Sequence, residues 1–202
     1  MKKIVMNYLM NFIKTNNPHY DDVKLAEIQY GLEGVYLTYS KLIIVIILAI
    51  ILNMFTEVII FLILYNFIRM PSFGLHATKS WICLLSSTII FIGFPLISKY
   101  LVIPIYIKSI LGIILIYFFF KNAPADTKKR PIVNPKRRLV YKYLSVFIAI
   151  IFVYNSILLK NNFLSNSFIL SLLVQSFMIS PTVYKTFGLS YDNYKNYLTN
   201  GI

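Results

Sequence analysis

Long apolar runs constrain this chain more than any other feature. From Leu42 to Ser180 the sequence is almost continuously hydrophobic, and its polar interruptions are short. Overall, 58% of the residues are hydrophobic, only 13% are charged, and the mean hydropathy is +0.70. A soluble domain of this length does not need so much apolar material for its core. The composition therefore predicts an all-α integral membrane protein.

The charged residues are strongly unbalanced. Twenty lysines and arginines face seven acidic residues, which gives a formal net charge of +13. In a membrane protein such an excess usually sets orientation and contacts anionic lipid, so we expect a lipid bilayer and no nucleic acid as partner. The single cysteine, Cys83, cannot form an internal disulfide, and no cluster of metal ligands is evident. We therefore expect a free thiol, no metal and no cofactor.

The first 40 residues are predicted to form interfacial helices. Apolar residues recur at helical spacing in the first segment, and lysines and asparagines occupy the rest of the helical wheel, which is typical of an amphipathic helix lying in the membrane interface. This segment has no cleavage site, so we expect it to remain in the mature protein. A second helix is predicted to begin near Asp21 and Asp22, whose carboxylates suit a positive helix N-terminus, and to run to Ser40. The apolar positions of the first helix are Ile4, Val5, Tyr8, Leu9, Phe12 and Ile13.

The next apolar stretch, 41–69, is open to two interpretations. Its two runs, 42–55 and 58–68, would measure only about 16 to 21 Å each as helices, against a hydrocarbon core of about 30 Å. The stretch is therefore either one long tilted span or a hairpin of two short ones. The membrane orientation decides for the hairpin, as follows.

The loop 121–142 carries eight basic residues and one acidic residue, which predicts a cytoplasmic location. Two spans at 81–120 then place the preceding polar segment, 70–83, in the cytoplasm as well. A cytoplasmic N-terminus requires an even number of crossings before that segment, which the hairpin supplies. The prediction is a multi-pass protein of the cell membrane with about six transmembrane helices and both termini in the cytoplasm. It forms a single domain over 1–202, with interfacial helices at 1–40, the hairpin at 41–69, the polar loop at 70–83, two spans at 81–120, the basic loop at 121–142, two spans at 143–180 and a cytoplasmic tail at 181–202.

One lysine, Lys108, falls in the middle of an apolar segment. Its ammonium group can snorkel to the interface or face a cavity, and an ionisable group at that depth is a candidate functional residue.

The polar loop contains His76 and, seven residues later, Cys83. An imidazole can take the proton of a thiol, and the thiolate can then attack a carbonyl carbon. A straight helix would separate the two residues by about 10.5 Å along its axis, so a catalytic pair needs a break between them. Turn formers such as Gly74, and a helix that starts just ahead of Cys83, would supply that break. The alternative is that the cysteine is a small buried hydrophobe and the histidine an interfacial residue.

Three stretches of the sequence carry a family resemblance. They read SFGLHATKSWIC at 72–83, IQYGLEG at 28–34 and APADTKKRP at 123–131. Together, in this order, they resemble the accessory gene regulator protein B (AgrB) family of membrane cysteine endopeptidases in quorum sensing. The similarity in length and hydropathy extends over essentially the whole chain. One departure is that Phe73 and Gly74 stand where many members are richer in glycine.

The resemblance implies a function and roles for residues. It implies an endopeptidase that cuts an AgrD-like autoinducer propeptide near its C-terminus and promotes cyclisation to a thiolactone or lactone. Cys83 matches the nucleophile and His76 the base, which makes 70–83 the catalytic loop on the cytoplasmic side. A third catalytic residue is not identified by the sequence. Gln29 and Glu33, one helical turn apart, are candidates for orienting the imidazole or contributing to the oxyanion site.

The same resemblance suggests two kinds of partner. The first is the propeptide, whose acidic C-terminal region would be attracted by the basic residues Lys128, Lys129 and Arg130 of the loop at 121–142. The second is another copy of the chain in a homodimer. A different class of function stays open beside the protease: a non-enzymatic peptide permease or assembly subunit in which His76 and Cys83 merely pack.

Overall fold

The computed structural model describes residues 2–75, 80–127, 131–195 and 197. The structure is 80% helical with no strand in this described part, and five of its helices are long and apolar enough to cross a membrane. These observations confirm the prediction of an all-α membrane protein. The chain forms two compact units, 1–48 and 49–202.

The N-terminal unit consists of helix α1, Lys2–Asn16, and most of helix α2, Asp22–Ile51. On α1 the side chains of Ile4, Tyr8 and Phe12 are exposed along one face, as an interfacial helix requires. Helix α2 begins where the two aspartates predicted it, because the Asp21 carboxylate accepts a hydrogen bond from the N–H of Lys24 at 2.8 Å.

Helix α2 differs from the prediction in its length. The interfacial helix expected to end by residue 40 continues without a break into the apolar run that follows, as far as Ile51. No proline interrupts this stretch, and the two glycines in it each cost a helix only about 1 kcal/mol. The break expected inside 41–69 is present: Asn53 has a positive φ of 53°, and helix α3, Phe55–Ser72, begins two residues later.

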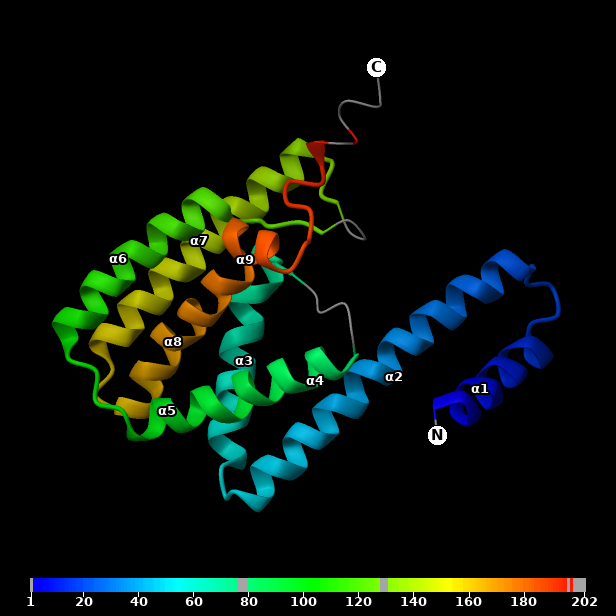
Figure 1. Cartoon of the computed structure of the whole chain (residues 1–202), viewed down its shortest axis with the longest axis horizontal. Coiled ribbons are helices and arrows are strands. Elements are labelled where there is room, and N and C mark those ends of the chain that lie inside the picture. The colour runs from blue at the N-terminus through cyan, green and yellow to red at the C-terminus, as the bar shows by residue number, and fades with distance from the viewer. Residues whose placement is uncertain (1, 76–79, 128–130, 196, 198–202) are drawn as a thin grey trace. The chain divides into compact units, whose positions relative to one another are not determined.

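The C-terminal unit is a helical bundle built around one central helix (Figure 1). Helix α8, Asn162–Met178, packs against α3 and against α5 (Phe94–Tyr100), α6 (Ile105–Asn122) and α7 (Pro135–Leu158). Ten of its seventeen residues are buried. Buried aromatic and aliphatic side chains such as Phe61, Phe119 and Ile169 fill the space around it. This unit also contains α4 (Ser80–Thr88) and α9 (Pro181–Thr186). A π-helical turn (Ile89–Gly93) joins α4 to α5.

The predicted number of about six spans is not confirmed. Five helical stretches meet the requirements of length and hydropathy: α2, α3, α6, α7 and the stretch Trp81–Tyr100, which runs through α4 and α5. In contrast, α8 has 17 residues. Its length of about 26 Å is shorter than a hydrocarbon core of about 30 Å. The basic loop is also shorter than its predicted limits, 121–142, because α6 continues to Asn122 and α7 already begins at Pro135.

The interior of the bundle is tightly packed, and among the described residues it contains one lysine. A side chain at Gly112 would meet Val153 at 2.4 Å, so α6 and α7 approach each other closely at this point. Lys108, on the first turn of α6, is 5% exposed, and its ammonium group donates to Ser165 Oγ at 2.6 Å. The lysine therefore neither snorkels to the surface nor lies in open space.

Candidate functional site

The backbone that leads into His76 is held by the loop after α6. Helix α3 ends at Ser72, and Phe73 and Gly74 then adopt positive φ angles of 59° and 117°. Phe73 forms a parallel β-bridge with Ala125, in which the Ala125 N–H donates to Ser72 O at 3.0 Å and the Gly74 N–H donates to Ala125 O at 2.9 Å. The turn after α3 is therefore fixed by backbone hydrogen bonds to a segment fifty residues further along the chain.

The C-terminal end of α8 holds the same turn from another side. The Leu75 N–H donates to Met178 O at 3.0 Å. Gln175 is completely buried, and its amide nitrogen donates at 2.7 Å both to Ser72 Oγ and to Phe73 O. Buried hydrogen bonds of this kind stabilise one backbone conformation, because breaking them would leave unpaired polar groups in the interior.

Arg69 closes the turn from α3. Its guanidinium group donates to the hydroxyl of Tyr65 at 2.8 Å and to Leu75 O at 3.1 Å. Leu75 is thus contacted by α3 through its carbonyl and by α8 through its N–H.

Gly74 cannot be replaced in this turn without strain. Its φ of 117° lies where residues with a side chain rarely occur, and an added Cβ would lie 2.9 Å from the main-chain oxygen of Met178. A glycine at this position lets the turn lie directly against the backbone of α8.

Cys83 lies in α4, whose described part begins three residues earlier, at Ser80. The thiol is free and half-buried, and the main-chain oxygen of Cys83 accepts a hydrogen bond from Ser86 Oγ at 3.1 Å. The chain is not helical from Phe73 to Leu75. The predicted break between His76 and Cys83 falls on 76–79, and these residues, His76 among them, lie outside the described residues, so the break stays a prediction.

The other predicted site residues are distributed as follows. Gln29 and Glu33 lie on α2 in the N-terminal unit, one turn apart, with Gln29 exposed and Glu33 half-buried. Their role beside Cys83, which belongs to the other unit, stays a prediction. Lys128, Lys129 and Arg130 lie outside the described residues. Within the described ranges, no group of three His, Cys, Asp or Glu side chains lies close enough together to hold a metal ion.

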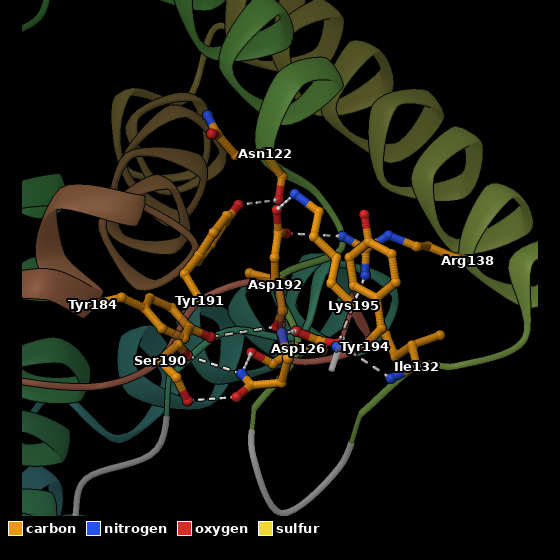
Figure 2. A network of polar contacts seen from close by, with 12 residues as sticks. Asn122, Asp126, Ile132, Arg138, Tyr184, Ser190, Tyr191, Asp192, Tyr194 and Lys195 are labelled. Atoms are coloured by element: carbon orange, nitrogen blue, oxygen red, sulfur yellow. Dashed lines mark hydrogen bonds and ion pairs between the residues drawn. The ribbon is translucent and has the colours of Figure 1, made fainter. Parts of the chain in front are cut away.

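Sequence reasoning missed a buried carboxylate beside this turn (Figure 2). Asp126 is 1% exposed and accepts three backbone hydrogen bonds. Its Oδ1 accepts from the N–H of Asn193 at 2.9 Å, and its Oδ2 accepts from the N–H of Tyr194 at 3.0 Å and of Ile132 at 3.3 Å. The guanidinium group of Arg138 lies 3.8 Å from the same carboxylate. Asp126 thus joins the loop after α6 to the C-terminal segment of the chain.

Further contacts of the C-terminal segment surround this carboxylate, as Figure 2 shows. The Tyr191 hydroxyl donates to Asn122 O at 3.0 Å, and the guanidinium carbon of Arg138 lies 3.7 Å from the centre of the Tyr194 ring. Burial raises the pKa of Tyr191 to about 12, so its phenol is protonated over the ordinary pH range. A sequence signal existed, since Asp126 is the single acidic residue in the basic loop at 121–142.

The fold defines the class of this protein as a multi-pass helical membrane protein. A family model described as Accessory gene regulator B, AgrB, matches residues 6–179. The chain therefore belongs to the AgrB family, a family of quorum-sensing regulators.

Individual relatives agree with this assignment. The chain is 31% identical over 189 residues to accessory gene regulator protein B of Staphylococcus aureus strain MRSA252, which covers 89% of this chain and 98% of the relative. It is 29% identical over 174 residues to a protein named AgrB-like of Clostridium acetobutylicum, covering 86% of this chain and 83% of the relative. A protein named AgrB-like of Listeria monocytogenes is 28% identical over 181 residues, covering 88% of this chain and 87% of the relative. No solved structure matches the chain.

Proposed function

We propose that this protein is a cysteine endopeptidase of the cell membrane that processes an AgrD-like autoinducer propeptide. Membership of the AgrB family supports a role in autoinducer processing. The observation that carries the catalytic part of the proposal is the position of Cys83. The thiol lies half-buried near the start of the described part of α4, shortly after a turn that three other parts of the chain hold in place.

The first half of the reaction is an acyl transfer to sulfur. His76 takes the proton of the Cys83 thiol, and the thiolate attacks the carbonyl carbon of the scissile peptide bond. Negative charge develops on the carbonyl oxygen at the positive end of α4, where N–H groups of the first turn have no partner within the helix. The C–N bond then breaks, and His76 returns its proton to the amine of the departing C-terminal fragment. The N-terminal part of the propeptide remains bound to Cys83 as a thioester.

The second half releases a ring. A thiol or hydroxyl within the bound propeptide attacks the thioester carbonyl, His76 takes the proton of that group, and the Cys83 sulfur leaves and is reprotonated. The product is a thiolactone or a lactone, and the enzyme returns to its starting state. Water must be kept from the thioester, because hydrolysis would give a linear product. A half-buried thiol covered by the propeptide itself meets this requirement.

The remaining parts of the proposal concern orientation and partners. The site lies on the cytoplasmic side of the membrane, as do both termini, because the loop that carries Lys128, Lys129 and Arg130 is strongly basic. These three residues attract the acidic C-terminal region of the propeptide. Gln29 or Glu33 contributes to orienting the imidazole or to the oxyanion site. The protein acts as a homodimer, as the family resemblance suggests.

Co-expression with a candidate propeptide tests this function. The propeptide should have an amphipathic N-terminal region, an internal cysteine or serine and an acidic tail, and mass spectrometry should detect the released C-terminal fragment. We expect the fragment with the parent protein and none with Cys83→Ala or His76→Ala. Thr88→Ala is the matched control, because Thr88 lies on the same helix and donates only to Leu84 O within it. We expect this variant to process the propeptide like the parent.

The same experiment separates the protease from the alternative function. Processing by Cys83→Ala at the parental rate would show that the proposed chemistry is wrong. A permease would move intact labelled propeptide across vesicle membranes, and the two alanine substitutions would leave that transport unchanged.

A further inference from the structure

We propose that Asp126 is a positioning residue of the processing site, and that it acts by fastening the C-terminal segment Ser190–Lys195 to the loop that holds the turn before His76. The inference rests on the proposed function. It goes beyond it by assigning a role to the C-terminal segment and to a residue that does not touch the reacting atoms.

The first step of the argument is the environment of Asp126. An ionised carboxylate that is 1% exposed must be compensated, because burying an unpaired charge is costly. Three backbone N–H groups supply this compensation: two come from the C-terminal segment at 2.9 and 3.0 Å, and one comes from Ile132 at 3.3 Å. Hydrogen bonds to a charged acceptor are about twice as strong as neutral ones. The C-terminal segment is thus the main partner of this carboxylate.

The second step is the position of Asp126 in the chain. It directly follows Ala125, whose N–H donates to Ser72 O and whose carbonyl accepts from Gly74 at 3.0 and 2.9 Å. The hydroxyl of Tyr184 also lies 3.4 Å from Ala125 O. One peptide unit therefore separates the carboxylate that binds the C-terminal segment from the backbone that binds the turn before His76. A displacement of Asp126 must move Ala125 and, with it, this turn.

The third step is the shape of the C-terminal segment. Ser190 and Asn193 close a small turn. The side-chain amide of Asn193 donates to the main-chain oxygen of Ser190 at 2.8 Å, and the two side chains are hydrogen-bonded to each other. Figure 2 shows this turn beside the Asp126 carboxylate. Because the turn is closed by its own contacts, the backbone N–H groups of Asn193 and Tyr194 are presented to Asp126 together. The segment then docks as one unit.

The contacts of Asp126 argue against a direct catalytic role. Both carboxylate oxygens already accept hydrogen bonds from the backbone, and the guanidinium group of Arg138 lies 3.8 Å away. A side chain that is buried and fully engaged in this way is unsuited to bind a substrate or to exchange a proton with it. Its effect on the reaction must pass through the backbone.

The substitution Asp126→Asn tests the proposal. Asparagine has nearly the same shape, but one of its terminal atoms is a donor and would face N–H groups that also donate. We expect faster hydrogen–deuterium exchange in peptides that contain 190–195 and also in peptides that contain 72–75. We expect kcat for propeptide cleavage to fall between about 10-fold and 100-fold with a nearly unchanged KM, because small displacements of a reacting group have effects of this size. The pH profile of kcat should change shape as well.

Two further variants make the test specific. Asn193→Ala weakens the same contact from the other side and should give the same pattern in milder form, and combining it with Asp126→Asn should lower kcat no further than the stronger single variant does. Asp192→Asn is the matched control, because Asp192 belongs to the same network but pairs with Arg138 and Lys195 and not with the loop. We expect it to retain parental exchange at 72–75 and parental kcat.

The outcomes separate this proposal from the proposed function. The positioning role is wrong if Asp126→Asn speeds exchange only at 190–195. It is also wrong if the variant loses activity only in proportion to the loss of folded protein and keeps the parental pH profile. If the parent protein cleaves no propeptide, the proposed function fails and the positioning role of Asp126 in that reaction fails with it, whereas exchange at 72–75 still reports whether the two segments are coupled.

Discussion

Replacing Gly74 with alanine would place a methyl group against the backbone of α8. The added Cβ would lie 2.9 Å from Met178 O, whereas ordinary contacts begin at 3.4 Å, so the two segments must separate by about half an ångström. The φ of 117° adds a conformational cost of about 1 to 3 kcal/mol. The two backbone hydrogen bonds made by Gly74 and Leu75 are worth about 0.5 to 1.5 kcal/mol each, and the separation would weaken both.

These contributions disfavour the native turn by roughly 2 to 6 kcal/mol. Because the turn can rearrange locally, we expect Gly74→Ala to lower the equilibrium constant for forming the native turn by about 30-fold or more, and propeptide processing to fall with it. The fall in melting temperature should be smaller than that loss of activity implies. Mass spectrometry of the released fragment and thermal unfolding in detergent measure the two effects on the same preparation.

Gly188→Ala is the control for this experiment. Gly188 also has a positive φ, 63°, but nothing lies within 4 Å of an added Cβ. The substitution therefore costs only the free energy of placing alanine in the left-handed conformation, about 1 kcal/mol, and processing should stay close to the parental rate. Parental processing and stability in Gly74→Ala would refute the claim that the turn after α3 must lie against α8.

Three further predictions concern the bundle and its polar contacts. Gln175→Ala removes two buried hydrogen bonds to the end of α3, and we expect thermal unfolding to show a loss of about 1 to 3 kcal/mol together with slower processing. Lys108→Met replaces a buried cation, which has Ser165 as its hydrogen-bond partner, by an apolar side chain of similar length; the melting temperature should stay the same or rise, and a selective loss of processing would instead make Lys108 a functional residue. The phenol of Tyr191 ionises near pH 10 in the unfolded chain and near 12 in the folded one, so the free energy of unfolding should fall as pH rises from 10 to 12, and less so in Tyr191→Phe.

The helices could be predicted from the sequence because the apolar runs and their polar breaks determine most of them. Helix α1, the start of α2 and the break near Asn53 follow from such local signals. The early start of α7 also had a signal that we did not use. Asn134 precedes Pro135 and its side chain accepts hydrogen bonds from the first turn, which is typical of a helix N-terminus. The positive charge of 121–142 had instead favoured the prediction of a loop over this whole range.

The candidate site could be predicted only in its local part. The motif around Cys83 and the need for a non-helical turn before it follow from residue types and spacing. The contacts that hold the turn do not, because Gln175 and Ala125 meet it across 103 and about 50 residues of chain, and a hydrophobic pattern contains no information on such pairs. Ser171 and Ser176 illustrate the same limit, since each hydroxyl donates to a carbonyl of α8 itself, a choice of partner that residue type does not determine.

The central claim is that Cys83 carries the propeptide as a thioester. Purified protein should be mixed with the propeptide, quenched in acid within the first turnover, and analysed as intact protein by mass spectrometry. We predict an added mass equal to the propeptide without its C-terminal fragment, located on Cys83 and removed by hydroxylamine. The adduct should be absent from Cys83→Ala. Cleavage of the propeptide by Cys83→Ala, or an adduct located on another residue, would contradict the account.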